Sequence, residues 1–282
     1  RIVTIGGGTG QDALLSGLKT IPDLDITAIV TMADSGGSSG VLRTERGVLP
    51  PGDILRCLLA LATVDADVVR LFEYRLAEGG GIGGHTIGNI ALTGAAEQQE
   101  SFLEGIATIG KILAVRGNVL PVTLDRVELH GRRADGTTID GEHHFGQPHT
   151  TARITDVWLE PSAKPLLEAI EVIRNADAII IGPGSLWTSI IPNILVEGVS
   201  DALDASHGRL VFIANAMTEP GETDGCSAED AVGAFERYAK RAVDVIVSNT
   251  RRPDADILAK YEREGATWIS PAISASTPIV SS

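Results

Sequence analysis

"IVTIGGGTG", residues 2–10, is a short apolar run that ends in a cluster of glycines. Its first four residues are all β-branched, which is typical of a buried strand, and apolar residues then recur with helical spacing as far as Leu18. A strand that leads through a glycine-rich turn into a helix is the unit from which α/β proteins are built. This opening stretch therefore predicts the fold class.

Similar junctions recur further along the chain. Residues 26–40 run from an apolar strand into "MADSGGSSG", and residues 178–185 run from an apolar strand into "GPGS". Two more strands, at 210–214 and 243–247, each precede a polar loop and a helical segment. Strands that alternate with helices form mainly parallel sheets, so we expect a Rossmann-like α/β fold with helices flanking the sheet.

The middle of the chain has a different pattern. Residues 53–114 are mostly helical in pattern and are interrupted by the glycine-rich stretch 79–85, so we expect a helical insert. Residues 119–160 alternate as strands, with an Asp-Gly hairpin turn at 135–136, and we expect these extra strands to extend the sheet. No low-complexity linker or internal repeat divides the chain, which predicts one domain over 1–282.

Composition narrows the class of protein. The chain has 282 residues, 43% of them hydrophobic, and a formal net charge of −14, which argues against a nucleic-acid or anionic-lipid surface. Cys57 and Cys226 are too few for a disulfide framework, so we expect a reduced, cytoplasmic setting. No apolar stretch reaches the length of a membrane span, and no signal peptide opens the chain. Because Arg1 leads directly into a strand, we expect native residues to precede it.

The glycines at 6–10 have two interpretations. They permit a tight turn, and they also let backbone N–H groups approach an anion at the positive end of a helix. The dinucleotide-binding fingerprint needs a third glycine at the position of Gln11, which weakens the case for a nicotinamide enzyme. Asp34, after the second strand, lies where such folds place a ribose-binding acid.

Other polar residues near the junctions also have a structural and a functional interpretation. The stretch 35–40 is either a flexible surface loop or a ligand loop, and Asp53 is either a helix N-cap or a ligand residue. Arg56 is by default a solvated charge, and His85, after its glycine-rich loop, is either solvated or part of a site. These alternatives stay open from spacing alone.

Known catalytic and metal-binding spacings are missing from the sequence. His143, His144 and His149 lie close together, but no carboxylate or cysteine spacing completes a familiar site, so we expect no metal there. The Walker lysine motif, HExxH and CxxC do not occur. We therefore predict no catalytic residues.

Taken in order, the motifs resemble one family closely. The segments that carry the resemblance are "IGGGTG", "ADSGGSSG" with "LRTERGVLPPGDI", "GHTIGN", "LEP", "GPGSLWTSIIPN" and "MTEPGETDG". They are similar to the successive motifs of YvcK proteins, the gluconeogenesis factors, in a superfamily shared with the 2-phospho-L-lactate transferase CofD. The resemblance runs from Ile2 to about Ala272.

The resemblance implies a Rossmann-like fold and a cytoplasmic bacterial protein that binds UDP-sugars, notably UDP-N-acetylglucosamine. It also implies a role in cell shape and cell-wall synthesis during gluconeogenic growth, without a settled reaction. The CofD branch transfers a phospholactyl group from a guanosine diphosphate-linked donor to a deazaflavin, with magnesium, and its acids map to Asp34 and Asp53. That branch has a different pattern where this chain has residues 215–221, which favours the regulatory function.

Three positions depart from the usual YvcK pattern. Ser35 replaces a second acid, which weakens metal-assisted chemistry because divalent ions favour paired carboxylates. Trp187 replaces a tyrosine and keeps an aromatic face for stacking, and Cys226 replaces an aromatic residue.

We therefore predict a nucleotide-sugar-binding regulatory protein, with a CofD-like transferase and an NAD-binding oxidoreductase as alternatives. The expected partners are a small-molecule nucleotide sugar and a protein of cell-wall regulation, and Mg²⁺ is an optional cofactor at Asp34 and Asp53. Because residues 190–199 are more apolar than one helix stripe requires, we expect a homodimer or larger assembly. The expected ligand-binding residues are Gly7, Gly8, Thr9, Gly10, Asp34, Ser35, Gly36, Gly37, Ser38, Ser39, Asp53, Arg56, His85, Asn89, Gly182, Gly184, Ser185, Trp187, Asn215 and Thr218.

Overall fold

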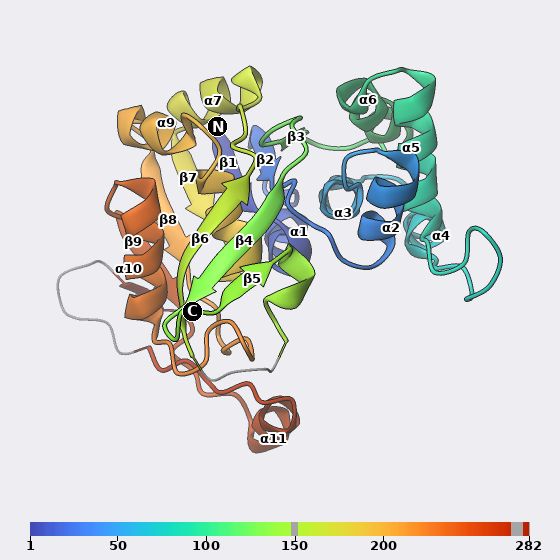
Figure 1. Ribbon diagram of the computed structural model, residues 1–282. Coiled ribbons are helices and arrows are strands. Elements are labelled where there is room, and N and C mark those ends of the chain that lie inside the picture. The colour runs from blue at the N-terminus through green and yellow to red at the C-terminus, as the bar shows by residue number, and fades with distance from the viewer. Residues whose placement is uncertain (148–151, 272–278, 282) are drawn as a thin grey trace.

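A computed structural model describes residues 1–147, 152–271 and 279–281, and its main feature is a seven-stranded parallel sheet (Figure 1). The strand order is β10-β9-β8-β7-β1-β2-β3. The strands are β1 (Ile2–Gly6), β2 (Ile26–Val30), β3 (Asn118–Pro121), β7 (Ala178–Ile181), β8 (Arg209–Ile213), β9 (Val245–Ser248) and β10 (Ile279–Ser281). The chain builds outward from β1 to β3 and then returns to place β7 beside β1. This confirms the Rossmann-like fold and puts the topological switch point between β1 and β7.

Helices cover both faces of this sheet. The first group comprises α1 (Gly8–Leu18), α2 (Gly37–Arg46), α3 (Gly52–Leu61), α4 (Ala66–Glu73), α5 (Ile87–Gln98) and α6 (Phe102–Ile112). The second comprises α7 (Leu167–Arg174), α8 (Ile191–Ile194), α9 (Val199–Ala205) and α10 (Ala228–Ala239), and α11 (Ala255–Arg263) follows β9. The first group contains the predicted helical insert, α3–α6.

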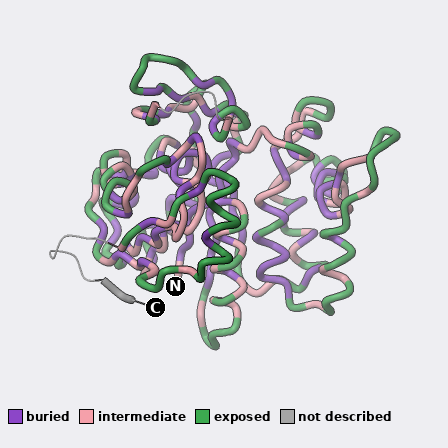
Figure 2. The backbone as a smooth tube through the Cα atoms, turned by 90° about the horizontal axis from the view of Figure 1, so that it is seen from below, coloured by how far each residue is buried: buried purple, intermediate pink, exposed green. Residues whose placement is uncertain are grey.

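The hydrophobic core has two parts, one on each face of the sheet. Along β2, Ala28 and Val30 pack with the helical insert, whereas Ile29 packs with the residues of α7–α10. This division follows from the strand geometry, because successive side chains point to opposite faces. Figure 2 shows buried segments both in the sheet and in the helical group beside it.

The prediction that residues 119–160 extend the sheet is wrong for most of that segment. Only β3 joins the main sheet; β4 (Glu128–Arg133), β5 (Thr138–Asp140) and β6 (Ile154–Glu160) form a separate antiparallel sheet. Buried and exposed residues alternate along β4, so its sheet lies over the core with one face in solvent. The Asp-Gly hairpin is confirmed: β4 and β5 are antiparallel, and Gly136 has a φ of 87°.

The stretch 35–40 is not a loop throughout, because α2 already begins at Gly37. The amide of Gly40 donates to the carbonyl oxygen of Gly36 at 2.9 Å. A Cβ atom at Gly40 would lie 2.1 Å from the carbonyl oxygen of Ser35, so only glycine permits this tight first turn. The glycines therefore start a helix instead of making the segment flexible.

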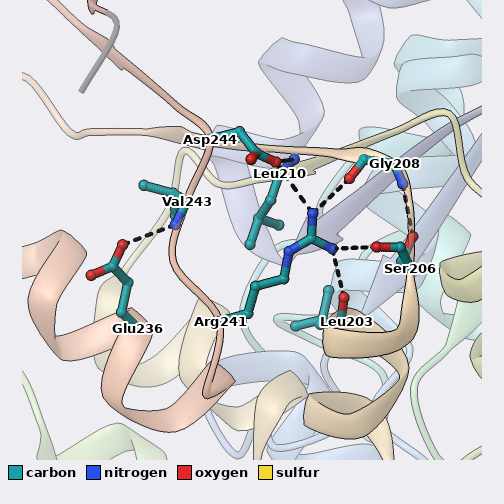
Figure 3. A network of polar contacts seen from close by, with 8 residues as sticks. All are labelled: Leu203, Ser206, Gly208, Leu210, Glu236, Arg241, Val243 and Asp244. Atoms are coloured by element: carbon teal, nitrogen blue, oxygen red, sulfur yellow. Dashed lines mark hydrogen bonds and ion pairs between the residues drawn. The ribbon is translucent and has the colours of Figure 1, made fainter. Parts of the chain in front are cut away.

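A network around Arg241 joins α9, α10, β8 and β9 at the amino ends of the strands (Figure 3). The guanidinium donates to the carbonyl oxygens of Leu203, Ser206 and Gly208 at distances of 2.6–3.0 Å. It also lies 3.2 Å from a carboxylate oxygen of Asp244, which in turn accepts a hydrogen bond from the backbone of β8. This network is on the edge of the sheet opposite to the glycine junctions.

The apolar segment 190–199 is explained by the chain's own core. Ile190, Ile191, Ile194 and Val199 are buried within the molecule, so this segment gives no support to the predicted assembly, which stays a prediction. Within the described residues, no helix has both the length and the apolarity needed to cross a bilayer.

Candidate functional site

The three glycine junctions meet at the carboxyl ends of neighbouring strands. Gly10, in the first turn of α1, packs so closely on the loop after β7 that a Cβ atom there would lie 2.2 Å from the carbonyl oxygen of Pro183. A Cβ atom at Gly184 would lie 3.5 Å from the carbonyl oxygen of Gly7. These contacts bring the predicted glycines Gly7, Gly10 and Gly184 together at the switch point. Open α/β sheets bind ligands in a crevice at this place, and we refer to the region where the turns after β1 and β7 meet as the crevice.

Three carboxylates gather beside this crevice. A Cβ atom at Gly36 would lie 3.6 Å from an oxygen of Asp34 and 3.7 Å from an oxygen of Glu142, and one at Gly7 would lie 2.7 Å from an oxygen of Asp53. Asp34 also accepts a hydrogen bond of 2.9 Å from the amide of Gly36. Glu142 comes from the segment after β5 and was not predicted from the sequence.

The environment of Asp53 and Glu142 favours their neutral forms. Burial, followed by the negative charge of Asp34, raises the pKa of Asp53 to about 6, although Arg56 and the amide of Gly8 oppose the shift. Burial and Asp34 also raise the pKa of Glu142 to about 7. An anionic ligand in this crevice therefore meets acids that are readily protonated or neutralised by a cation.

The free backbone N–H groups at the amino end of α1 already have one hydrogen-bond acceptor within the protein. The carboxylate of Asp53 accepts a hydrogen bond from the amide of Gly8, one of the donors that a phosphate would use. Asp53 lies in the first turn of α3, which begins at Gly52, so it is not the residue that caps that helix. This places Asp53 against the glycine turn.

The donor set suits a hard divalent ion only in part. Mg²⁺ prefers oxygen ligands and is often held by one or two carboxylates together with substrate phosphates. Across residues 1–147, 152–271 and 279–281, no group of three or more His, Cys, Asp or Glu side chains has the arrangement of a metal site. Asp34 and Asp53 would therefore hold such an ion as a pair that a ligand completes.

A second acidic pair lies on the other side of the crevice. Ser185 donates a hydrogen bond of 2.5 Å to Glu222, and burial together with the nearby Glu219 raises the pKa of Glu222 to about 8. Both glutamates belong to "MTEPGETDG", but the sequence offered no reason to select them. Burial also raises the pKa of Glu219, and both carboxyl groups lie within hydrogen-bond reach of Ser185 in the loop after β7.

The loops after β7 and β8 are held together by Asn215. Its side-chain amide accepts from the amide of Gly184 at 3.2 Å and donates to the carbonyl of Gly184 at 2.9 Å. Thr218, by contrast, is buried and pairs with Thr267, so its side chain is engaged away from the glycine turns. Trp187 is 5% exposed, and its indole N–H donates to the carbonyl of Glu222, which leaves little ring face for stacking on a ligand.

Residues of α2 and α5 form a connected polar group. The hydroxyl of Ser38 lies 2.8 Å from Nδ1 of His85 and accepts from the amide group of Asn89 at 3.0 Å. Ser39 accepts from the amide of Gly52, next to Asp53. His85 and Asn89 are both buried, so neither is a solvated surface residue.

The remaining predicted residues lie around these groups. Arg56 is exposed and donates to the hydroxyl of Thr9 at 2.5 Å. Ser35 contacts Glu142 through its amide at 3.4 Å and His143 through its hydroxyl at 3.1 Å. His149 lies outside the described residues, and Gly37 starts α2 with a φ of 46°.

Gln11 has a structural role that separates this fold from dinucleotide-binding proteins. Its buried amide donates to Thr4 at 3.0 Å and to the carbonyl of Ile29 at 3.1 Å, and Cys57 lies 3.6 Å from its oxygen. In the fingerprint, a glycine here permits close packing of helix and strand. A glutamine that joins α1 to β1 and β2 fills that space instead.

Comparisons with known proteins agree with these features. The family model for CofD, 2-phospho-L-lactate transferase, matches residues 2–276. The gluconeogenesis factor of Halalkalibacterium halodurans is 44% identical over 94% of this chain and 82% of its own length, and that of Listeria monocytogenes is 42% identical over 92% and 80%. A crystal structure of a UPF0052 family member from Bacillus halodurans has a TM-score of 0.94 at 42% identity and covers 100% of this chain and 91% of that one.

The match with the family model covers nearly the whole chain, and the relatives are similar across most of their own length. Together with the glycine crevice at the switch point, these similarities show that the chain belongs to the CofD/YvcK family.

Proposed function

We propose that this protein binds a nucleotide sugar and acts as a regulatory protein, with UDP-N-acetylglucosamine as the ligand. The observation that carries the proposal is the meeting of the glycine turns after β1 and β7 with the acids Asp34 and Glu222 around one crevice. Backbone amides at glycine turns suit a diphosphate, and carboxylates suit the hydroxyl groups of ribose and sugar. Relatives named gluconeogenesis factors support a role in central carbon metabolism.

When a diphosphate binds in the crevice, the negative charge of the nearby carboxylates must be neutralised. Asp34, Asp53 and Glu142 place negative charge where the phosphates would lie, unless protons or a cation neutralise it. Asp34 and Asp53 are the residues that would hold Mg²⁺, and the ion would bring the acids and the diphosphate together. We further propose a cytoplasmic location and a partner protein through which the bound state influences cell shape and cell-wall synthesis.

Titration calorimetry with UDP-N-acetylglucosamine, GDP and NAD tests the proposal. We expect the UDP-sugar to bind most tightly. Binding of NAD with no binding of the UDP-sugar would overturn the proposal and favour an oxidoreductase, which the buried Gln11 makes the weakest alternative.

A CofD-like phospholactyl transferase is the second candidate. The match to a family model described as 2-phospho-L-lactate transferase supports it, as does the pair of acids at positions 34 and 53. Preferential binding of GDP in the presence of Mg²⁺ would favour this candidate over the regulatory one.

A further inference from the structure

A separate cavity opens beside the crevice, between α1, α3, the end of α4 and the start of α5. Its volume is about 290 Å³, near the lower end of the 300–1,000 Å³ that is usual for ligand pockets. This is room for one ring of a ligand and not for a whole nucleotide sugar. Arg56 and Asn89 lie on its wall and also contact residues of the crevice, Thr9 and Ser38.

The cavity wall carries equal numbers of positive and negative side chains, and they do not form ion pairs with one another. Asp12 and Glu73 supply two negative charges, and Arg56 and Arg75 supply two positive charges. In the part of the chain that the structure describes, no ion pair joins any two of these four residues. Burial raises the pKa of Asp12 despite the nearby Arg56, which is the behaviour of a carboxyl group lacking a close ionic partner.

The cavity also has an apolar floor. Leu55, Leu59 and Phe72 form it, and Thr86 and Asn89 add polar groups at the start of α5. A net neutral wall disfavours a phosphate, which needs an excess of positive charge. A neutral ring with several hydroxyl groups fits better, because carboxylates accept and guanidiniums donate hydrogen bonds while the C–H face of the ring covers the apolar floor.

We propose that this cavity binds the sugar part of the nucleotide sugar, with Asp12, Glu73 and Arg75 as the residues that determine sugar specificity. The inference rests on the proposed function and assigns a place to one half of its ligand. The diphosphate would then lie over the glycine turns, and Arg56, which contacts Thr9, would lie between the two halves.

The test compares two ligands that differ only by the sugar. UDP and UDP-N-acetylglucosamine are titrated into the wild type, Glu73→Gln and Asp12→Asn. A hydrogen bond to a charged group is worth about tenfold or more in affinity, so each variant should bind UDP-N-acetylglucosamine at least tenfold more weakly. Affinity for UDP should stay within about twofold, since UDP lacks the group that the cavity holds.

Glu78→Gln is the matched control, because it makes the same charge change in the exposed loop that follows α4 and lies off the cavity wall. It should leave both affinities unchanged. Equal weakening of UDP and UDP-sugar binding by Glu73→Gln would place the nucleotide part in the cavity and overturn the inference while the proposed function survives. Unchanged binding of both ligands would overturn it in the same way. If the wild type binds neither ligand, the proposed function fails, and this assignment fails with it.

Discussion

Gly10 and Pro183 are in such close contact that a methyl group on Gly10 would lie 2.2 Å from the carbonyl oxygen of Pro183. The two residues are 173 positions apart in the chain, and each follows a different strand of the sheet. Their contact fixes the distance between the glycine turns after β1 and β7. The shape of the crevice therefore depends on a position that admits no side chain.

Gly10→Ala should separate these two turns and lower both stability and ligand affinity. The overlap is with backbone, which cannot rotate away, so we expect the free energy of unfolding to fall by about 2–4 kcal/mol. Gly17→Ala is the matched control in the same helix, since among the described residues no atom other than those of its chain neighbours and its own helix backbone lies within 4 Å of the added methyl group. That variant should gain up to about 1 kcal/mol from helix propensity. Chemical denaturation of both variants checks the contrast, and equal effects would contradict it.

Asp34→Asn should weaken binding of the nucleotide sugar and raise its Kd by about one to two orders of magnitude. The reason is that a hydrogen bond to a charged acceptor is worth about 1.5–3 kcal/mol. The asparagine oxygen can still accept from the amide of Gly36, so stability should hardly change. Calorimetry and a thermal melt measure the two effects. A lowered melting temperature with unchanged binding would mean that Asp34 only shapes the turn.

The same variant tests for a metal. If Mg²⁺ strengthens ligand binding to the wild type but not to Asp34→Asn, the carboxylate carries the ion, and the transferase candidate gains support. If Mg²⁺ has equal effects on both proteins, Asp34 acts on the ligand directly.

Glu222 should make stability depend on pH. Burial raises its pKa from 4.5 to about 8, so the folded state binds the proton more tightly than the unfolded state does. The free energy of unfolding therefore falls as pH rises from about 4.5 to 8 and is flat above that range. Glu142, with a pKa raised to about 7, changes stability with the same sign over a narrower range.

Glu222→Gln removes this titration while its side-chain oxygen still accepts from Ser185. We expect a gain of about 1–2 kcal/mol at pH 8, reduced from the full value of the shift because the site is partly open to solvent. The difference from wild type should vanish near pH 4.5. Glu262→Gln, on the exposed side of α11, is the control and should leave the pH profile of the melting temperature unchanged. A wild-type profile that is flat from pH 5 to 8 would contradict the prediction.

Arg241→Gln should destabilise the fold without changing ligand affinity. The variant leaves the carbonyl oxygens of Leu203, Ser206 and Gly208 without their charged donor, at a cost of about 2–3 kcal/mol. The network is at the amino ends of the strands, whereas the crevice is at their carboxyl ends, so Kd should be unaffected under conditions where the variant is folded. Arg174→Gln, at an exposed position on α7, is the control. A weaker ligand Kd for folded Arg241→Gln would show that the two edges are coupled.

The local sequence determined much of this protein. Short apolar runs predicted β1, β2, β7, β8 and β9, because a strand's composition reflects burial on both faces. The glycines that follow three of these strands predicted that their turns meet, since parallel strands bring their carboxyl ends to the same edge of the sheet. The order of motifs was enough to predict the family.

Only the tertiary structure decided which distant side chains join those turns. Glu142 contacts the amide of Ser35 from 107 residues away, and Glu73, at the end of α4, lines the same cavity as Asp12 of α1. The separate antiparallel sheet was also missed, because alternation along a strand shows that one face is buried but not which strand it pairs with. Strand pairing and contacts between distant side chains depend on how the helices and strands pack together. No local pattern in the chain carries that information.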